Sequence, residues 1–174
     1  MNRKIILNLA MSLDGYIACD DGSYEWIVGY GSNKLDTEVK YDFNKFLETV
    51  DVVVMGKNCY EAGFHNDYKD KKVYVATSEE LADYDNIHFI KGDIVKRILE
   101  EREEEGKDIF LFGGGILVDH FIKANVIDEY IIGFIPTILG QGRPLFLGNN
   151  PQIDLQLEEY IVDEGIIIGR YSKR

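Results

Sequence analysis

The sequence predicts an α/β fold, with a mostly parallel mixed sheet between two layers of helices and an antiparallel hairpin at the C-terminus. Short apolar runs alternate with amphipathic segments over most of the chain, which is typical of parallel strands joined by helices. Residues 157–171 instead place apolar residues on both sides of Glu164-Gly165, which is typical of a hairpin. A length of 174 residues, 45% of them hydrophobic, predicts one domain over 1–174.

Each predicted strand is a short apolar run bounded by polar residues or glycine. Six such strands precede the hairpin: 5–10, 51–55, 72–76, 87–90, 108–112 and 128–135. A first helix is expected to be capped by Ser32, because apolar residues from Leu35 to Leu47 recur at spacings of three and four. A second helix is expected to be capped by Asp93, with 100–105 as its solvated face and Gly106 as its end. A third follows the glycines 113–115.

The charge balance narrows the classes of partner. A net charge of −12 argues against nucleic acid or an anionic membrane as the principal partner, because both favour a basic surface. A phosphate site would therefore need backbone N–H groups and a few local cations. Cys19 and Cys59 show no metal-binding spacing, which predicts a reduced, cytoplasmic protein with no metal. No apolar run is long enough to predict a membrane span.

Three consecutive glycines, 113–115, stand between a predicted strand and a predicted helix. Glycine lets a ligand approach the backbone closely, since no Cβ intervenes. The helix that follows would direct free N–H groups and a partial positive charge at that ligand. The segment is therefore interpreted as a phosphate or pyrophosphate site, or alternatively as a tight turn that packs the helix on the strand.

Two further strand ends carry side chains suited to phosphate. Gly56-Lys57 follows one strand, where the lysine could neutralise a phosphate or simply be a solvated surface residue. Thr77-Ser78 follows the next, where the hydroxyls could bind phosphate or cap a turn. In open α/β sheets ligands bind beyond the carboxyl ends of the strands, so one nucleotide could contact all three places.

Two candidates lie elsewhere in the chain. Asp42 lies near the boundary of the first helix's apolar face, where a half-buried carboxylate could transfer protons, although most such aspartates are solvated. Trp26 ends a long polar loop, 11–26, and could flank a flat ligand or anchor a core or lid. The loop is expected to close over the site and exclude water.

Four motifs in fixed order resemble the dihydrofolate reductase superfamily. They are 12–18 (Ser-Leu-Asp-Gly-Tyr-Ile-Ala), 54–61 (Val-Met-Gly-Lys-Asn-Cys-Tyr-Glu), 76–78 (Ala-Thr-Ser) and 112–115 (Phe-Gly-Gly-Gly). The first motif and the Gly/Pro segment 135–146 resemble one branch of this superfamily in particular. They are similar to the C-terminal reductase domain of the riboflavin-biosynthesis deaminase–reductase and its stand-alone bacterial relatives. The resemblance covers nearly the whole chain and implies a dihydrofolate reductase-like fold.

The resemblance implies NADPH as cofactor and matches specific positions to it. Lys57 stands where many relatives have arginine, and Cys59 where many have threonine. Thr77 and Ser78 match contacts to the 2′-phosphate, and the family holds a cis peptide between the first two glycines. The implied cofactor-binding residues are Ala10, Ile17, Gly56, Lys57, Cys59, Thr77, Ser78, Phe112, Gly113, Gly114, Gly115 and Ile116.

The substrate half of the resemblance is less complete. Asp42 matches the acid that orients and helps protonate the pterin, and is the implied catalytic residue. Ile132 stands where folate-reducing enzymes usually have threonine, and no arginine matches the one that binds the folate tail. The implied substrate-binding residues are Asn8, Trp26, Asp42 and Phe46.

The resemblance implies that hydride passes to a pterin- or pyrimidine-like heterocycle. The reaction would be of the dihydrofolate reductase or 5-amino-6-(5-phosphoribosylamino)uracil reductase type, in a homodimer. Two alternatives stay open: a non-catalytic NADP(H)-binding or sensor protein with a diverged substrate site, and an interaction protein with a decayed site. Lys57, Thr77-Ser78 and the three glycines argue against full decay.

Overall fold

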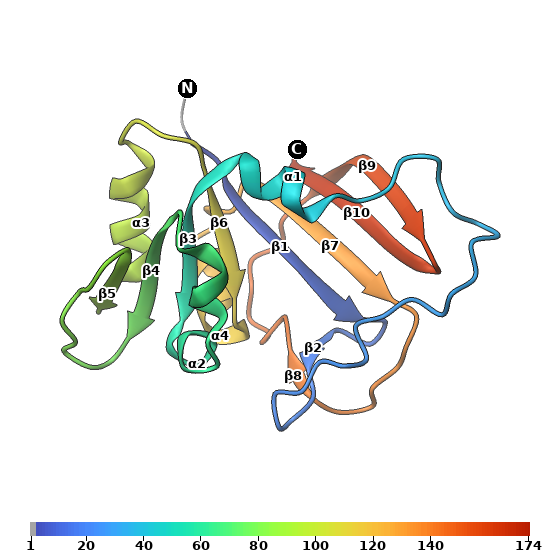
Figure 1. Cartoon of the computed structure of the whole chain (residues 1–174), viewed down its shortest axis with the longest axis horizontal. Coiled ribbons are helices and arrows are strands. Elements are labelled where there is room, and N and C mark those ends of the chain that lie inside the picture. Colours follow the sequence, from blue (N-terminus) through green and yellow to red (C-terminus); the bar gives the residue numbers. More distant parts are fainter. Residues whose placement is uncertain (1–2) are drawn as a thin grey trace.

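A computed structural model describes residues 3–174, and its elements follow the predicted alternation of strands and helices (Figure 1). Among these residues, no helix is both long and apolar enough to cross a bilayer. The elements in chain order are β1 (Ile5–Ser12), β2 (Tyr16–Ala18), α1 (Phe43–Glu48), β3 (Val50–Gly56), α2 (Lys57–Glu61), the 3-10 helix η1 (Phe64–Tyr68), β4 (Lys72–Thr77), β5 (Ile87–Lys91), α3 (Ile94–Arg102), β6 (Asp108–Gly113), α4 (Gly115–Lys123), β7 (Glu129–Ile135), β8 (Arg143–Pro144), β9 (Leu155–Asp163) and β10 (Ile166–Lys173).

The main sheet has eight strands in the order β5-β4-β3-β6-β1-β7-β10-β9. The strands from β5 to β7 pair in parallel, while β10 runs antiparallel to both β7 and β9. The predicted six strands and closing hairpin are therefore confirmed. In Figure 1 the carboxyl ends of β1, β3, β4 and β6 lie along the lower side of the sheet.

The core lies on both faces of the sheet, as the predicted fold class requires. Side chains alternate between the faces along each strand, because the strand repeat is two residues. Leu7 in β1 packs with Val118 and Phe121 of α4, whereas its neighbour Ile6 belongs to the opposite cluster with Phe46 of α1. Since both faces are covered, the central strands are mostly apolar.

The predicted helix from Ser32 is wrong for most of its length. The helix α1 begins only at Phe43, and Leu35 and Val39 are 71% and 63% exposed. The segment before it lies along the turn of the β9–β10 hairpin. Thr37 N donates to Val162 O at 3.0 Å, and Glu164 N donates to an Asp36 carboxylate oxygen at 2.8 Å. The segment therefore forms hydrogen bonds with the hairpin instead of a helix, because a helix would leave its apolar residues with nothing to pack against.

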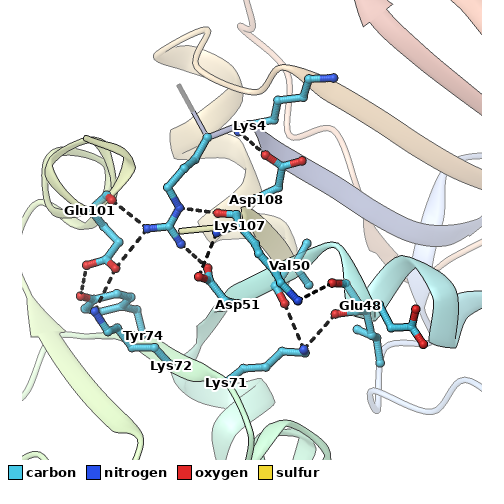
Figure 2. Close-up of polar contacts among 12 residues, drawn as sticks. Lys4, Glu48, Val50, Asp51, Lys71, Lys72, Tyr74, Glu101, Lys107 and Asp108 are labelled. Atoms are coloured by element: carbon cyan, nitrogen blue, oxygen red, sulfur yellow. Dashed lines mark hydrogen bonds and ion pairs between the residues drawn. The ribbon is translucent and has the colours of Figure 1, made fainter. Parts of the chain in front are cut away.

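The prediction that 100–105 is a solvated helix face is also wrong in part. Helix α3 is capped by Asp93 as predicted, but it ends at Arg102, and Glu101 is only 3% exposed. Figure 2 shows its carboxylate beside Tyr74 and Lys72, at the amino end of β4. A cluster of opposite charges, described below, makes this burial tolerable.

The loops 11–26 and 136–147 are joined, which the sequence did not predict. The short strands β2 and β8 form an antiparallel pair, and Leu145 N donates to Gly15 O at 3.0 Å. The Asp14 carboxylate also accepts hydrogen bonds from Leu139 N at 3.1 Å and Gly140 N at 2.8 Å. These two loops therefore form a single layer below the ends of the strands (Figure 1).

Candidate functional site

A cleft of about 1910 Å³ lies at the carboxyl ends of the parallel strands. Its walls include Ala10 of β1, Gly56 of β3, Thr77 of β4 and Gly113 of β6. The joined loops contribute Ile17 from β2 and Arg143 with Pro144 from β8. The cleft is thus where an open α/β sheet ordinarily binds its ligand.

The triple glycine forms the turn between β6 and α4. Gly113 has φ +128°, a conformation that favours glycine, and its peptide bond to Gly114 is cis, as the resemblance implied. Gly114 caps α4, whose first helical bond runs from Val118 N to Gly114 O at 3.0 Å. A Cβ on Gly115 would come within 2.8 Å of Pro144 O, so this glycine permits the close approach of β8.

The β3–α2 and β6–α4 junctions lie against each other. A Cβ on Gly56 would lie 3.8 Å from Gly114 N, which places the two predicted phosphate-binding turns side by side. Cys59, one turn into α2, is half-buried, and burial raises the pKa of its thiol. The thiol is therefore protonated at neutral pH and can act only as a weak hydrogen-bond donor or acceptor.

Lys57 enters the cleft at the start of α2, where two carboxylates flank it. Its Nζ lies 2.5 Å from Glu79 Oε1 and 3.5 Å from Glu61 Oε1. The hydrogen bond to Glu79 raises the pKa of Lys57, so the ammonium stays charged. Thr77 Oγ1 accepts a hydrogen bond from Glu79 N at 3.1 Å, which is the turn-capping role considered for it, while exposed Ser78 also lines the cleft.

The structure brings all the residues proposed for the cofactor into one cleft. Its lining includes Ala10, Ile17, Gly56, Lys57, Cys59, Thr77, Ser78, Phe112, Gly113, Gly114, Gly115 and Ile116. Segments up to about a hundred residues apart in the chain thus meet at one surface, as the shared strand ends predict. Their contact with a dinucleotide stays a prediction.

The residues proposed for the substrate are only partly gathered there. Asn8 lines the cleft, and its Nδ2 donates to Tyr41 Oη at 2.5 Å. Phe46 is buried and stacks edge-on against Phe110, with ring centroids 5.1 Å apart. Trp26 is half-buried and does not line the cleft, and its Nε1 has no hydrogen-bond partner among the described residues.

Asp42 caps helix α1 at the edge of the site. It is exposed, and its carboxylate accepts a hydrogen bond from Lys45 N at 3.0 Å. Its neighbour Phe43 lines the cleft, but Asp42 does not. Burial raises the pKa of the adjacent Tyr41, a shift that Asn8 opposes and Asp42 reinforces. A carboxylate, a phenol and an amide thus lie together at this edge of the cleft.

Several lining residues were missed by the sequence reasoning. Tyr24, Lys96, His120 and Arg143 all line the cleft. The guanidinium of Arg143 lies next to Gly22 and donates to Asp20 O at 3.2 Å. The signal for Arg143 was its position in the Gly/Pro segment that carried the resemblance. Its place opposite Asp20 depends on the unpredicted β2–β8 pair.

Known proteins share this architecture over nearly the whole chain. A protein of Shewanella sp. PV-4 assigned to riboflavin biosynthesis is 28% identical, with a TM-score of 0.80 covering 100% of this chain and 99% of its own. Dihydrofolate reductase of Enterococcus faecalis, solved with NADP(H) and RAB-propyl, is 18% identical, with a TM-score of 0.67 covering 100% and 99%. The fold is therefore dihydrofolate reductase-like.

The sequence comparisons agree with the structural ones. YwjB of Bacillus subtilis (strain 168), whose function is uncharacterized, is 36% identical over 154 residues, or 84% of each chain. The family model described as the RibD C-terminal domain matches residues 3–66 and 65–165. These matches include every strand from β1 to β9, the triple glycine and the joined loops. The chain therefore belongs to the RibD C-terminal domain family.

Proposed function

We propose that this protein is an NADPH-dependent reductase of a pterin- or pyrimidine-like heterocycle, of the dihydrofolate reductase or 5-amino-6-(5-phosphoribosylamino)uracil reductase type. The observation that supports this most is the convergence of the predicted cofactor residues on one cleft of about 1910 Å³. The family and the solved relative with NADP(H) support the same reaction class.

The residues present fit a dinucleotide. The turn at Gly114 is open, because no atom lies within 4 Å of the position its Cβ would occupy. Backbone N–H groups at the start of α4 and the ammonium of Lys57 suit a pyrophosphate and a 2′-phosphate. When bound, NADPH would supply the hydride. The chain would then orient the ring, exclude water and deliver a proton.

The substrate would bind at the end of the cleft lined by Asn8 and Phe43. Proton delivery is assigned to Asp42, acting through water, because it is exposed beside Tyr41 at this end. Asn8 and Tyr41, already hydrogen-bonded to each other, can orient a polar ring edge. Arg143 offers a cation to an acidic group on either ligand.

The second candidate is a non-catalytic NADP(H)-binding or sensor protein. This candidate is favoured because Asp42 caps a helix and Phe46 lies in the core. Two of the residues proposed for the substrate therefore have structural roles instead. Measuring NADPH oxidation with dihydrofolate, dihydropterins and aminopyrimidinediones separates the two functions. Turnover of one of these compounds is expected; saturable NADPH binding without any turnover would favour the sensor.

Lys57→Ala is expected to weaken NADPH binding about tenfold while changing NADH binding less than twofold. Hydrogen bonds to charged groups contribute about 1.5–3 kcal/mol, and the partial exposure of Lys57 places its effect at the lower end. The measurement is titration calorimetry with each nucleotide. Lys91→Ala is the matched control, because Lys91 ends β5 and pairs with Glu80 outside the cleft. Equal losses for both nucleotides would remove Lys57 from the 2′-phosphate.

The assembly and location follow from the proposed class. We propose a cytoplasmic homodimer, the assembly common among relatives. An apolar groove of about 570 Å³ between α4 and the β7–β10–β9 edge, with exposed Phe146 and Leu157 in its walls, is the surface best suited to a second copy. The free thiols of Cys19 and Cys59 agree with a reducing compartment.

A further inference from the structure

We infer that Glu79 limits the preference of the cleft for NADPH over NADH, by competing with the nucleotide 2′-phosphate for Lys57. The inference rests on the proposed function, because it concerns how the nucleotide is selected at the same site. It assigns a role to a residue at the edge of the cleft that neither the motifs nor the resemblance singled out.

Two carboxylates lie beside the ammonium of Lys57. Its Nζ is hydrogen-bonded to Glu79 Oε1 at 2.5 Å and lies 3.5 Å from Glu61 Oε1. One ammonium thus faces two carboxylates, and the local charge of the three groups is −1. These two carboxylates offset the attraction of the ammonium for a 2′-phosphate, which is itself negatively charged.

Glu79 lies at the edge of the cleft, directly after Thr77 and Ser78. Its backbone N–H donates to Thr77 Oγ1 at 3.1 Å, which fixes the turn that follows β4. Thr77 and Ser78 line the cleft directly before it, so the carboxylate stands at the edge where these hydroxyls and Lys57 meet. The side chain is 56% exposed, so an incoming nucleotide can reach it without moving the core.

NADPH and NADH differ in the group that they would present to Lys57 and Glu79. A 2′-phosphate must break the Lys57–Glu79 pair and then remain beside the displaced carboxylate, which repels it. An unphosphorylated ribose has hydroxyl groups that can donate to that carboxylate instead. In other dinucleotide sites, an acidic side chain accepts a hydrogen bond from the ribose 2′-OH, whereas an arginine accommodates the 2′-phosphate. Glu79 therefore acts against NADPH and in favour of NADH.

The test is the affinity of the full chain for each nucleotide, with Glu79→Gln compared with the wild type by calorimetry. We expect Glu79→Gln to strengthen NADPH binding about fivefold or more, since it frees Lys57 and removes a repelling charge at a partly exposed site. NADH binding should stay within about twofold of the wild type, or weaken. Glu61→Gln should act in the same direction with a smaller effect, because Glu61 lies 3.5 Å from Nζ.

Glu80→Gln is the matched control. It removes one negative charge at the next position, but Glu80 pairs with Lys91 at 3.2 Å rather than with Lys57. If Glu79→Gln and Glu80→Gln change the NADPH-to-NADH affinity ratio equally, general charge accounts for the effect and the inference is overturned. An unchanged ratio in Glu79→Gln, with both nucleotides still bound, overturns the inference alone. Failure of the wild type to bind either nucleotide overturns the proposed function as well.

Discussion

Gly114→Val is expected to lower the affinity for NADPH by about 5- to 150-fold without unfolding the protein. Gly114 has φ −91° and ψ −161°, an extended conformation open to any residue, and no atom lies within 4 Å of where its Cβ would be. The new side chain would therefore project into the cleft. Overpacking costs about 1–3 kcal/mol, which corresponds to this range of affinity.

The measurement is nucleotide titration together with thermal unfolding. Gly114→Ala provides a graded control, because its smaller side chain should cause a smaller loss of affinity. A melting temperature close to that of the wild type would show that the loss belongs to the cleft. If Gly114→Val binds NADPH as the wild type does, the triple glycine is a packing device, the alternative that the sequence left open.

Glu101→Gln is expected to destabilise the protein by about 3–5 kcal/mol, because its buried carboxylate is the shared counter-charge of buried Arg3 and of the partly exposed Lys72 and Arg97. The carboxylate accepts hydrogen bonds from Tyr74 Oη at 2.6 Å and Lys72 Nζ at 2.9 Å, and Arg97 Nη2 lies 3.2 Å away. Arg3 adds a further ion pair at 3.4 Å. For a chain of this length the melting temperature should fall by about 6–20 °C.

The same cluster predicts a pH dependence of stability. Burial alone would raise the pKa of Glu101, but hydrogen bonds from Tyr74 and Lys72 outweigh burial and hold the pKa below its usual value. Because the folded-state pKa is lowered, the stabilisation is present above the unfolded pKa of about 4.3 and is lost as the pH falls below it. Glu101→Gln should therefore lose part of the acid sensitivity measured by denaturant titration.

Glu100→Gln serves as the control for both measurements. It lies in the same helix but is exposed, so its melting temperature should change by about 1 °C or less. A wild-type melting temperature in Glu101→Gln would show that the charged cluster can be replaced by neutral hydrogen bonds. Tyr74→Phe, which removes the donor at 2.6 Å, should give an intermediate loss.

The sheet could be predicted because its signals are local. Apolar runs such as Val52–Val54 are buried on both faces, so composition alone identifies them as central strands. The gathering of the residues proposed for the cofactor followed from the same reasoning, since glycines and hydroxyls directly after parallel strands must meet at one edge of the sheet. Gly56 and Gly114 do lie close together there, and the residues proposed for the cofactor line a single cleft.

The two wrong predictions, the helix from Ser32 and the solvated face 100–105, have one cause. In both cases a segment distant in the sequence determines the local structure. The residues from Ser32 onwards have a helical spacing, but the hairpin's backbone N–H groups donate hydrogen bonds to Thr37 Oγ1 and an Asp36 carboxylate oxygen and hold the segment in an irregular conformation. Glu101 lies within an acidic run that looks solvated, and the partners that stabilise its burial include Lys72 and Arg3, the latter about a hundred residues away. No window of sequence contains both members of these pairs, so periodicity could not reveal them.

The joined loops have a kinetic consequence for any ligand. Because β2 pairs with β8, and Asp14 holds Leu139 and Gly140, loop 11–26 cannot leave the cleft without breaking contacts to a segment more than 120 residues away. We expect the two loops to open as one flap, whose opening rate governs how long the ligand stays bound. Substitution of Asp14 by alanine, which removes the acceptor of both hydrogen bonds, would then act mainly on the dissociation rate. The residence time of a ligand is therefore the property that we expect this pairing to place under the control of the second loop.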